Sequence, residues 1–92
     1  MAKRLIWPGS ELGHRRPRVI PALARAGWQD CFRQRNPRAP GFTLGSRQRV
    51  ARVDYIFASK PLAARLRACQ VLSGPEVAAA SDHSPVWAEF GV

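Results

Sequence analysis

The sequence predicts a small α+β domain, because short helical and short strand patterns follow one another along one chain. The chain has 92 residues, of which 46% are hydrophobic, so a single small domain is expected. Arg18 to Ala26 carry apolar residues at helical spacing, whereas Pro85 to Phe90 alternate as in a terminal strand. Both patterns are short, which is typical of mixed helix and strand packing around one core.

The first predicted element is a helix that follows an irregular leader. Pro8 to Arg16 show no apolar period and are rich in turn formers and arginine, so residues 1–17 are assigned to the leader. The helix is predicted to begin near Ile20, because Pro21 is tolerated only in a first turn. Gly27 is placed to end it.

The remaining elements are predicted to be short. Apolar residues after the first helix, including Trp28, are read as anchoring contacts, and Asn36 to Gly41 as a loop. Three further segments then read, in order, as a strand, a short helix and a second strand before the terminal one: Val50 to Phe57, Leu62 to Arg67 and Cys69 to Leu72. In the first of these strands Val53, Tyr55 and Phe57 fall on one face, and Arg52, Asp54 and Ile56 on the other.

The charge balance is strongly basic, with a formal net charge of +9. Arginines crowd into residues 15–38 and recur at Arg47, Arg49 and Arg52. Guanidinium groups match phosphate oxygens, so this pattern suits a partner that carries phosphate. Solvated arginines and a GC-rich coding sequence explain the same composition without any ligand.

Cysteine usage and the N-terminal residues indicate a cytoplasmic protein. Cys31 and Cys69 are far apart in sequence and have no metal-binding spacing, so reduced thiols are expected. The residues before Pro8 lack the apolar stretch of a signal peptide, and no segment is long enough for a membrane span. His14 lies in the arginine-rich leader and is assigned no role.

Two stretches place ionisable side chains beside predicted strands, Arg52 to Phe57 and Ser81 to Pro85. Asp54 falls within an apolar strand, where a carboxylate has to be paired or hydrogen-bonded to offset its desolvation. If the two strands are neighbours, Asp54 can accept the N–H of His83 and so fix its tautomer. Asp82 then supplies a carboxylate for a metal ion or a metal-activated water, which suits attack on a phosphodiester.

Four ordered stretches resemble one family, the DNase-I-like endonuclease/exonuclease/phosphatase superfamily. They are Gly27-Trp28-Gln29-Asp30, Gly41-Phe42-Thr43, Arg52-Val53-Asp54-Tyr55-Ile56 and Ser81-Asp82-His83-Ser84-Pro85. The family carries, in this order, Gly-(Phe/Trp)-x-Asp after a helix, a Gly-x-Thr turn, an Arg-(Ile/Val)-Asp-Tyr strand and a closing Ser-Asp-His-x-Pro. By this resemblance residues 18–92 form a partial, C-terminal portion of the family domain.

The resemblance implies the C-terminal half of a four-layered α/β sandwich, with a mixed or antiparallel sheet and one or two flanking helices. It also implies metal-dependent phosphodiester hydrolysis with Mg²⁺ or Mn²⁺ in the full-length protein. His83 would be the catalytic histidine at the scissile phosphate, Asp54 would orient it, and Asp82 would lie in the metal and nucleophile environment. Asp30 and Thr43 match positions that are structural.

Parts of the family pattern are missing from the sequence. The family carries a metal-binding glutamate and an asparagine in its N-terminal half and a Gly-Asp-x-Asn motif before the helix, and Glu11 has neither the glycine nor the asparagine. One carboxylate is too few to hold a hard cation, so little or no hydrolysis is expected from this chain alone. Loss of the facing sheet is expected to expose one apolar surface and to promote self-association through Val53, Tyr55, Phe57, Val86 and Phe90.

Two other interpretations stay open. Arginines interleaved with Trp7, Trp28, Phe32 and Trp87 suit a non-catalytic module that binds nucleic acid. An inert remnant of a truncated gene is the second. Within the enzyme interpretation, the motifs fit DNA, RNA, phospholipid and phosphoinositide substrates equally well.

Overall fold

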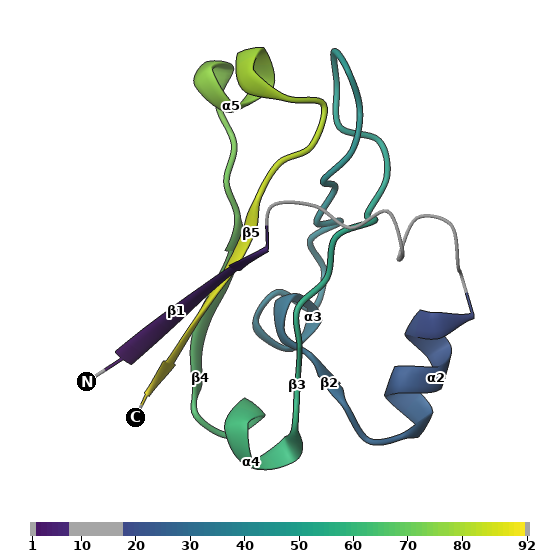
Figure 1. Ribbon diagram of the computed structural model, residues 1–92, viewed down its shortest axis with the longest axis vertical. Helices are drawn as coiled ribbons and strands as arrows, with labels where there is room; N and C mark the ends of the chain where they lie inside the picture. Colours follow the sequence, from purple (N-terminus) through teal and green to yellow (C-terminus); the bar gives the residue numbers. More distant parts are fainter. Residues whose placement is uncertain (1, 8–17, 92) are drawn as a thin grey trace.

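The computed structural model describes residues 2–7 and 18–91. Within them an antiparallel sheet has the strand order β1–β5–β4, with β1 at Ala2–Trp7, β5 at Val86–Gly91 and β4 at Leu66–Val71 (Figure 1). A shorter antiparallel pair joins β2 at Gln29–Asp30 to β3 at Phe57–Ala58. Short helices mixed with antiparallel strands confirm the predicted α+β class.

The helices connect and cover these strands. They are α2 at Val19–Arg25, α3 at Cys31–Arg35, α4 at Lys60–Ala63 and α5 at Pro75–Ala80. Figure 1 shows α3 in the middle of the molecule, between β4 and β3, with α2 at the outer side next to β2. This central helix is therefore the element that joins the two sets of strands.

The helix predicted from Ile20 is present as α2, with Pro21 in its first turn. It ends where predicted, because Gly27 adopts a positive φ of 92° after the C-cap Ala26. The Gly27 N–H donates to Ala24 O at 3.1 Å and the Trp28 N–H donates to Leu23 O at 3.0 Å, which is the Schellman pattern. Glycine satisfies the left-handed conformation at no steric cost.

The hydrophobic core lies where α3 crosses the face formed by β4 and β5. Its buried members are Cys31, Phe32, Ile56, Ala58, Ala63, Leu66, Cys69, Val86, Ala88 and Phe90. The predicted terminal strand is confirmed as β5, since Val86, Ala88 and Phe90 are buried and alternate with half-buried residues.

This packing corrects the exposed surface predicted from the sequence. Val53, Val86 and Phe90 are 8%, 1% and 4% exposed, so they offer no surface for self-association. For Val86 and Phe90 the physical reason is that α3 supplies Cys31 and Phe32 to the cluster in which they are buried. The other two residues of that surface, Tyr55 and Phe57, are half-buried and stack on each other with ring centroids 6.0 Å apart.

The prediction of a strand over Val50 to Phe57 is largely wrong, because most of this stretch does not pair with another strand. Only Phe57–Ala58 pairs with another strand, and Ala51 forms an isolated bridge with Leu44. The backbone between them is held by a side chain, because Thr43 Oγ1 accepts the N–H groups of Val53 and Asp54 at 3.1 and 3.2 Å. These two backbone N–H groups therefore have an acceptor without a neighbouring strand.

Several boundaries and elements differ from the sequence predictions. The helix predicted over Leu62 to Arg67 ends at Ala63, and β4 begins at Leu66, because Leu66 is drawn into the core by packing that overrides helical propensity. Helices α3 and α5 were not predicted. Strand β1 lies inside the predicted leader and pairs with β5 from Ala2 opposite Gly91 to Trp7 opposite Val86. The rest of the leader, 8–17, is outside the described residues.

No helix within residues 18–91 is both long and apolar enough to cross a membrane. The cytoplasmic location inferred from the sequence stays a prediction.

Candidate active site

One short segment, Thr43–Leu44, connects the two stretches that carry the candidate residues. Leu44 forms antiparallel bridges both to Ala51 and to His83. The Thr43 N–H donates to Ala51 O at 2.8 Å, and Thr43 O accepts the N–H of Ser84 at 2.7 Å. The two candidate stretches are therefore neighbours through a third segment, and not as adjacent strands of one sheet.

Asp54 and His83 meet across this segment. Asp54 Oδ2 lies 2.9 Å from His83 Nδ1, a hydrogen-bond distance between side chains 29 residues apart. The Asp54 side chain is fully buried, whereas that of His83 is 26% exposed. Since a carboxylate only accepts, Nδ1 carries the shared proton and the other ring nitrogen, Nε2, holds a lone pair in the neutral ring. The contact predicted from the sequence is thus present in the structure.

Asp82 directly precedes His83 in the chain. Its side chain is exposed, and its backbone O accepts the N–H of Gly45 at 2.9 Å. Among the described residues there is no group of three or more His, Cys, Asp or Glu side chains that could hold a metal ion. Mg²⁺ and Mn²⁺ prefer about six oxygen ligands, so the described residues do not by themselves fit such an ion. The metal role of Asp82 stays a prediction.

Asp30 has a structural position, as its family match implies. It is the N-cap of α3, and its Oδ1 accepts the N–H of Arg33 at 3.2 Å. Both carboxylate oxygens also accept from Arg52, at 2.6 and 2.5 Å. The Arg52 guanidinium lies over the rings of Tyr55 and Phe32, 4.2 and 5.2 Å from their centroids.

The sequence indicates no individual role for Arg49, which belongs to a basic cluster suited to phosphate. In the structure its guanidinium donates to Ser84 Oγ and to backbone oxygens of Gly45, Ser81 and His83. Arg49 and Arg52 thus bind other groups of the protein, and Arg47 is the exposed member of the three. Backbone carbonyls occur at every residue, so no sequence pattern indicates these acceptors.

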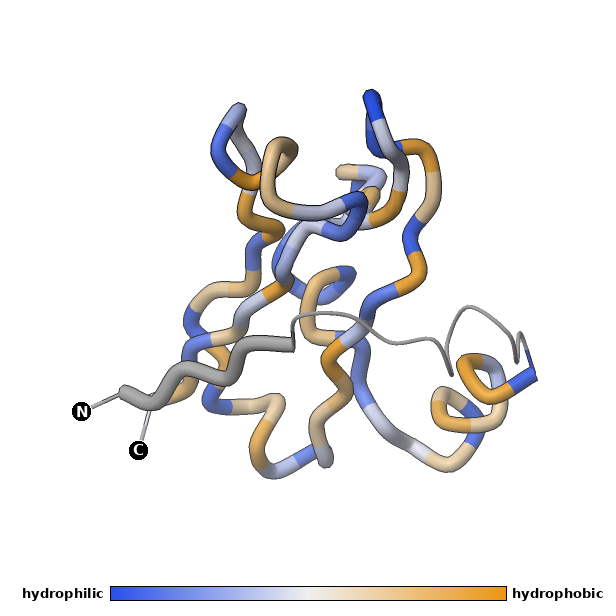
Figure 2. Tube along the Cα trace, turned by 45° about the horizontal axis from the view of Figure 1, so that its top comes forward, coloured by the Kyte–Doolittle hydropathy of each residue, from blue (hydrophilic) through white to orange (hydrophobic). Residues whose placement is uncertain are grey.

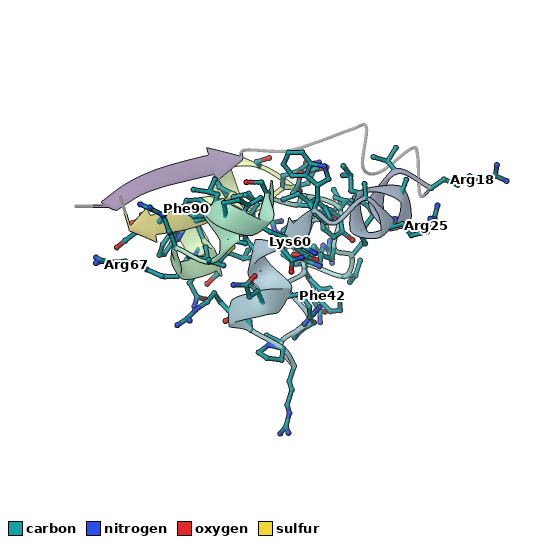
Figure 3. The ribbon with its side chains drawn as sticks, turned by 90° about the horizontal axis from the view of Figure 1, so that it is seen from below. Arg18, Arg25, Phe42, Lys60, Arg67 and Phe90 are labelled. Atoms are coloured by element: carbon teal, nitrogen blue, oxygen red, sulfur yellow. The ribbon has the colours of Figure 1, made fainter. Side chains whose placement is uncertain are left out.

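Three other arginines of the described residues lie on different sides of the molecule. Figure 3 shows Arg18 and Arg25 projecting from α2 on one side and Arg67 projecting from β4 on the opposite side. Near the candidate site, the tip of the loop between Leu44 and Ala51 is hydrophilic and stands beside the α5 end of the molecule (Figure 2). Within residues 18–91, basic charge is therefore present on more than one side of the molecule.

Aromatic side chains of the described residues differ in the surface they offer for stacking, and Phe42 is 43% exposed. Phe32 is 4% exposed and belongs to the core, so it is not available to a nucleic-acid base. Trp28 is 44% exposed and lines an open pocket of about 380 Å³ with Ala26, Gly27, Ser59 and Lys60. A smaller pocket of about 80 Å³ lies beside the His83 segment, lined by Arg47, Arg49, Ser73, Gly74, Ala78 and Ser84. The larger pocket contains none of the candidate catalytic residues.

The two cysteines lie in the core and outside the candidate site. Both are free thiols with no exposed surface. Burial, followed by the nearby charge of Asp30, raises the pKa of Cys31 to about 11. Burial, then the charges of Cys31 and Asp30, raises the pKa of Cys69 to about 12, although Arg52 acts in the opposite direction. Thiols of this kind are unreactive, so the role of the two cysteines is to pack in the core.

Comparisons with known proteins bear on the site. No protein-family model matches the sequence, and no curated protein matches it by sequence. Among solved structures, an AP endonuclease from Archaeoglobus fulgidus superposes with a TM-score of 0.69 and 30% identity, over 82% of this chain and 33% of that one. A 3′ phosphatase from Neisseria bound to a product DNA hairpin gives a TM-score of 0.65 and 30% identity, over 82% and 32%. The chain spans about a third of the length of each.

Proposed function

Because this chain belongs to the endonuclease/exonuclease/phosphatase superfamily, we propose that it supplies the histidine part of a site that hydrolyses phosphoesters. The observation that carries the proposal is the 2.9 Å contact between His83 Nδ1 and Asp54 Oδ2. A carboxylate that is fully buried and faces a half-buried imidazole is an arrangement suited to orient a general acid or base.

The proposed chemistry starts from the ring nitrogen that Asp54 leaves free. With Nδ1–H bonded to Asp54, Nε2 of His83 accepts a proton from an attacking water, whose oxygen bonds to phosphorus. The bond from phosphorus to the leaving oxygen breaks, and the imidazolium returns the proton to that oxygen. Asp54 stabilises the imidazolium in between. In a related role, the protonated ring donates to a phosphoryl oxygen in the transition state.

A divalent cation such as Mg²⁺ or Mn²⁺ is part of the proposal for the whole protein. When bound, it would neutralise charge on the phosphoryl oxygens. Its ligands would have to include residues beyond those described, since Asp82 is one exposed carboxylate without a neighbouring cluster. We therefore expect little or no metal-dependent hydrolysis from this chain alone.

DNA is the substrate class we favour. The two similar structures are an AP endonuclease and a 3′ phosphatase that holds a product DNA hairpin. Arg47, exposed beside the His83 segment, adds a cation close to where a phosphate would bind.

The test is a chimeric enzyme in which this chain replaces the matching third of the Archaeoglobus AP endonuclease. We expect it to cleave duplex DNA that carries an abasic site when Mg²⁺ or Mn²⁺ is present. His83→Ala should lower kcat roughly 10²- to 10⁴-fold while the circular dichroism spectrum shows that the chimera stays folded. Ordinary turnover by the folded His83→Ala chimera would refute the assignment, and so would a folded parent chimera without turnover.

The binding-module interpretation retains one supporting observation, the exposed Trp28 beside Lys60. It predicts that the chain binds single-stranded DNA with an affinity that falls steeply with salt. Under this alternative, Trp28→Ala weakens binding and His83→Ala leaves it intact. The opposite ranking of the two variants favours the phosphoesterase site.

A further inference from the structure

We propose that Arg49 is a positioning residue, whose guanidinium holds the backbone around His83 so that the imidazole meets Asp54. The contacts stand independently of the catalytic role, and the consequence for hydrolysis rests on the function proposed above. Arg49 acts on the backbone that carries His83.

The Arg49 guanidinium donates to three residues of the His83 segment. Nε donates to Ser84 Oγ at 2.7 Å, and Nη2 donates to Ser81 O at 2.8 Å and to His83 O at 3.2 Å. These acceptors lie on both sides of His83 and on His83 itself. The third nitrogen, Nη1, donates to Gly45 O. One side chain therefore connects the His83 segment to the loop that precedes Arg49.

The geometry of the guanidinium makes Arg49 a strong restraint. It is planar and rigid, and its donors diverge in fixed directions, so acceptors that bind it together are fixed relative to one another. A lysine ammonium carries its donors on one nitrogen at the end of a flexible stem. Lysine has the same charge, but its single nitrogen cannot donate to both Gly45 O and Ser81 O with the spacing that the guanidinium provides.

The Thr43–Leu44 segment already holds the opposite side of the His83 segment. Ser84 N–H donates to Thr43 O at 2.7 Å, and His83 bridges to Leu44. Ser84 is 2% exposed, so its hydroxyl lies inside the protein where Arg49 Nε reaches it. Arg49 completes the restraint from the other side. With its backbone held on both sides, the His83 ring is directed toward Asp54.

Local contacts within the segment are weaker restraints than this one. The Ser81 hydroxyl accepts the N–H of His83 at 3.0 Å, which shapes the turn but spans only two residues. Arg49 spans 32 to 35 residues of sequence to the same turn. A restraint between distant segments sets where the turn lies relative to Asp54, and a restraint within the turn cannot do so.

The experiment uses the 92-residue chain and follows the two nitrogens of the His83 ring by NMR, with His14→Gln separating the second histidine. Arg49→Met removes every donor while keeping a long side chain, and Arg49→Lys keeps the charge. Arg47→Met is the matched control, because Arg47 is exposed and two residues away. Amide hydrogen exchange at His83 and Ser84 is measured in parallel.

In the parent chain and in Arg47→Met, we expect the His83 proton on Nδ1. In Arg49→Met and Arg49→Lys, we expect a mixture of both ring tautomers and amide exchange at His83 roughly tenfold faster, from the loss of restraining hydrogen bonds. An Arg49→Met chain with the parent tautomer and parent exchange overturns the proposal. So does full rescue by Arg49→Lys, which would assign the effect to charge alone. Unfolding of both Arg49 variants while Arg47→Met stays folded would show a general structural role and would also overturn it.

The chimeric enzyme separates this inference from the proposed function. There, Arg49→Met should lower kcat with KM little changed, because Arg49 holds the histidine and leaves the substrate untouched. A chimera inactive in every form would defeat the phosphoesterase proposal and leave the NMR result on Arg49 standing. A raised KM at unchanged kcat would mean that Arg49 binds substrate, contrary to the positioning role.

Discussion

Arg52 and Asp30 form a two-pronged ion pair, with guanidinium nitrogens 2.6 and 2.5 Å from the two carboxylate oxygens. The pair joins the start of α3 to the stretch that carries Asp54, two residues beyond Arg52. Both side chains are largely withdrawn from solvent, at 13% and 22% exposure. The pair thus links the core helix to the candidate site.

Asp30→Asn should separate the two jobs of this carboxylate. Asparagine still caps α3 but loses the ion pair, which we expect to lower the free energy of unfolding by about 2 kcal/mol. Asp30→Ala also removes the cap and should cost about 1 kcal/mol more. Urea unfolding of both variants, and of each combined with Arg52→Met, checks this. Equal stability of Asp30→Asn and the parent would contradict a stabilising pair.

Thr43→Val should destabilise the chain more than its similar size suggests. The Thr43 hydroxyl is fully buried and accepts the N–H groups of Val53 and Asp54, so valine leaves both donors without that acceptor. We expect a loss of about 1–3 kcal/mol in the free energy of unfolding. Thr43→Ser keeps the hydroxyl and is the control, with a smaller loss from the missing methyl. If serine and valine cost the same, the hydroxyl is not the cause.

Gly41→Ala tests a close approach to the core. Gly41 has a positive φ of 67°, and a Cβ there would lie 2.5 Å from the Phe32 ring. Gly27→Ala is the matched control, since its φ is also positive but the nearest atom, on Lys60, would be at an ordinary 3.7 Å. We expect each to lose about 1–2 kcal/mol from backbone strain and Gly41→Ala to lose about 1–3 kcal/mol more from the clash. Thermal unfolding measures the difference, and equal losses would rule out the clash.

The buried thiols predict a loss of stability in alkali. Cys31 and Cys69 have folded pKa values of about 11 and about 12, above the ordinary value of 9.0. A raised folded pKa means that the neutral thiol's contribution is complete below pH 9 and declines as pH rises from there toward 11 to 12. By pH 10.5 we expect a loss of about 1–2 kcal/mol per thiol.

Urea unfolding between pH 7 and 10.5 measures this decline, and the double variant Cys31→Ala, Cys69→Ala is the comparison. The variant should be less stable at pH 7 because of the cavities it creates, yet its stability should fall less on going to pH 10.5. Parallel pH profiles for the two proteins would contradict the assignment to these thiols.

Elements that obey a single local rule were predictable. The alternation of Val86, Ala88 and Phe90 reports one buried face, and Gly27 reports a helix stop, so β5 and the end of α2 are where the sequence indicates. Strand β1 was not predictable in this way. It is a strand because its backbone pairs with the free side of β5, and pairing with a distant segment leaves little trace in the composition of either.

The candidate site shows the same division. A carboxylate inside an apolar stretch needs a partner, so the contact of Asp54 with His83 follows from desolvation. The contacts that bring the two side chains together do not follow from the sequence. Thr43 accepts backbone hydrogen bonds as a neighbouring strand would, and Arg49 donates to backbone carbonyls. A high arginine content suggests a surface that binds phosphate. Tertiary contacts decide which guanidinium groups remain available to bind it.

The Thr43–Leu44 segment is bonded to the stretches of both Asp54 and His83, so a shift of this segment would carry the two side chains as a unit. The distance between the Asp54 and His83 side chains therefore does not depend on the outer turn at Ser46–Gln48, which is exposed. The turn can therefore change in length or sequence during evolution and adapt to different substrates. The distance between Asp54 and His83, on which proton transfer depends, stays constant meanwhile.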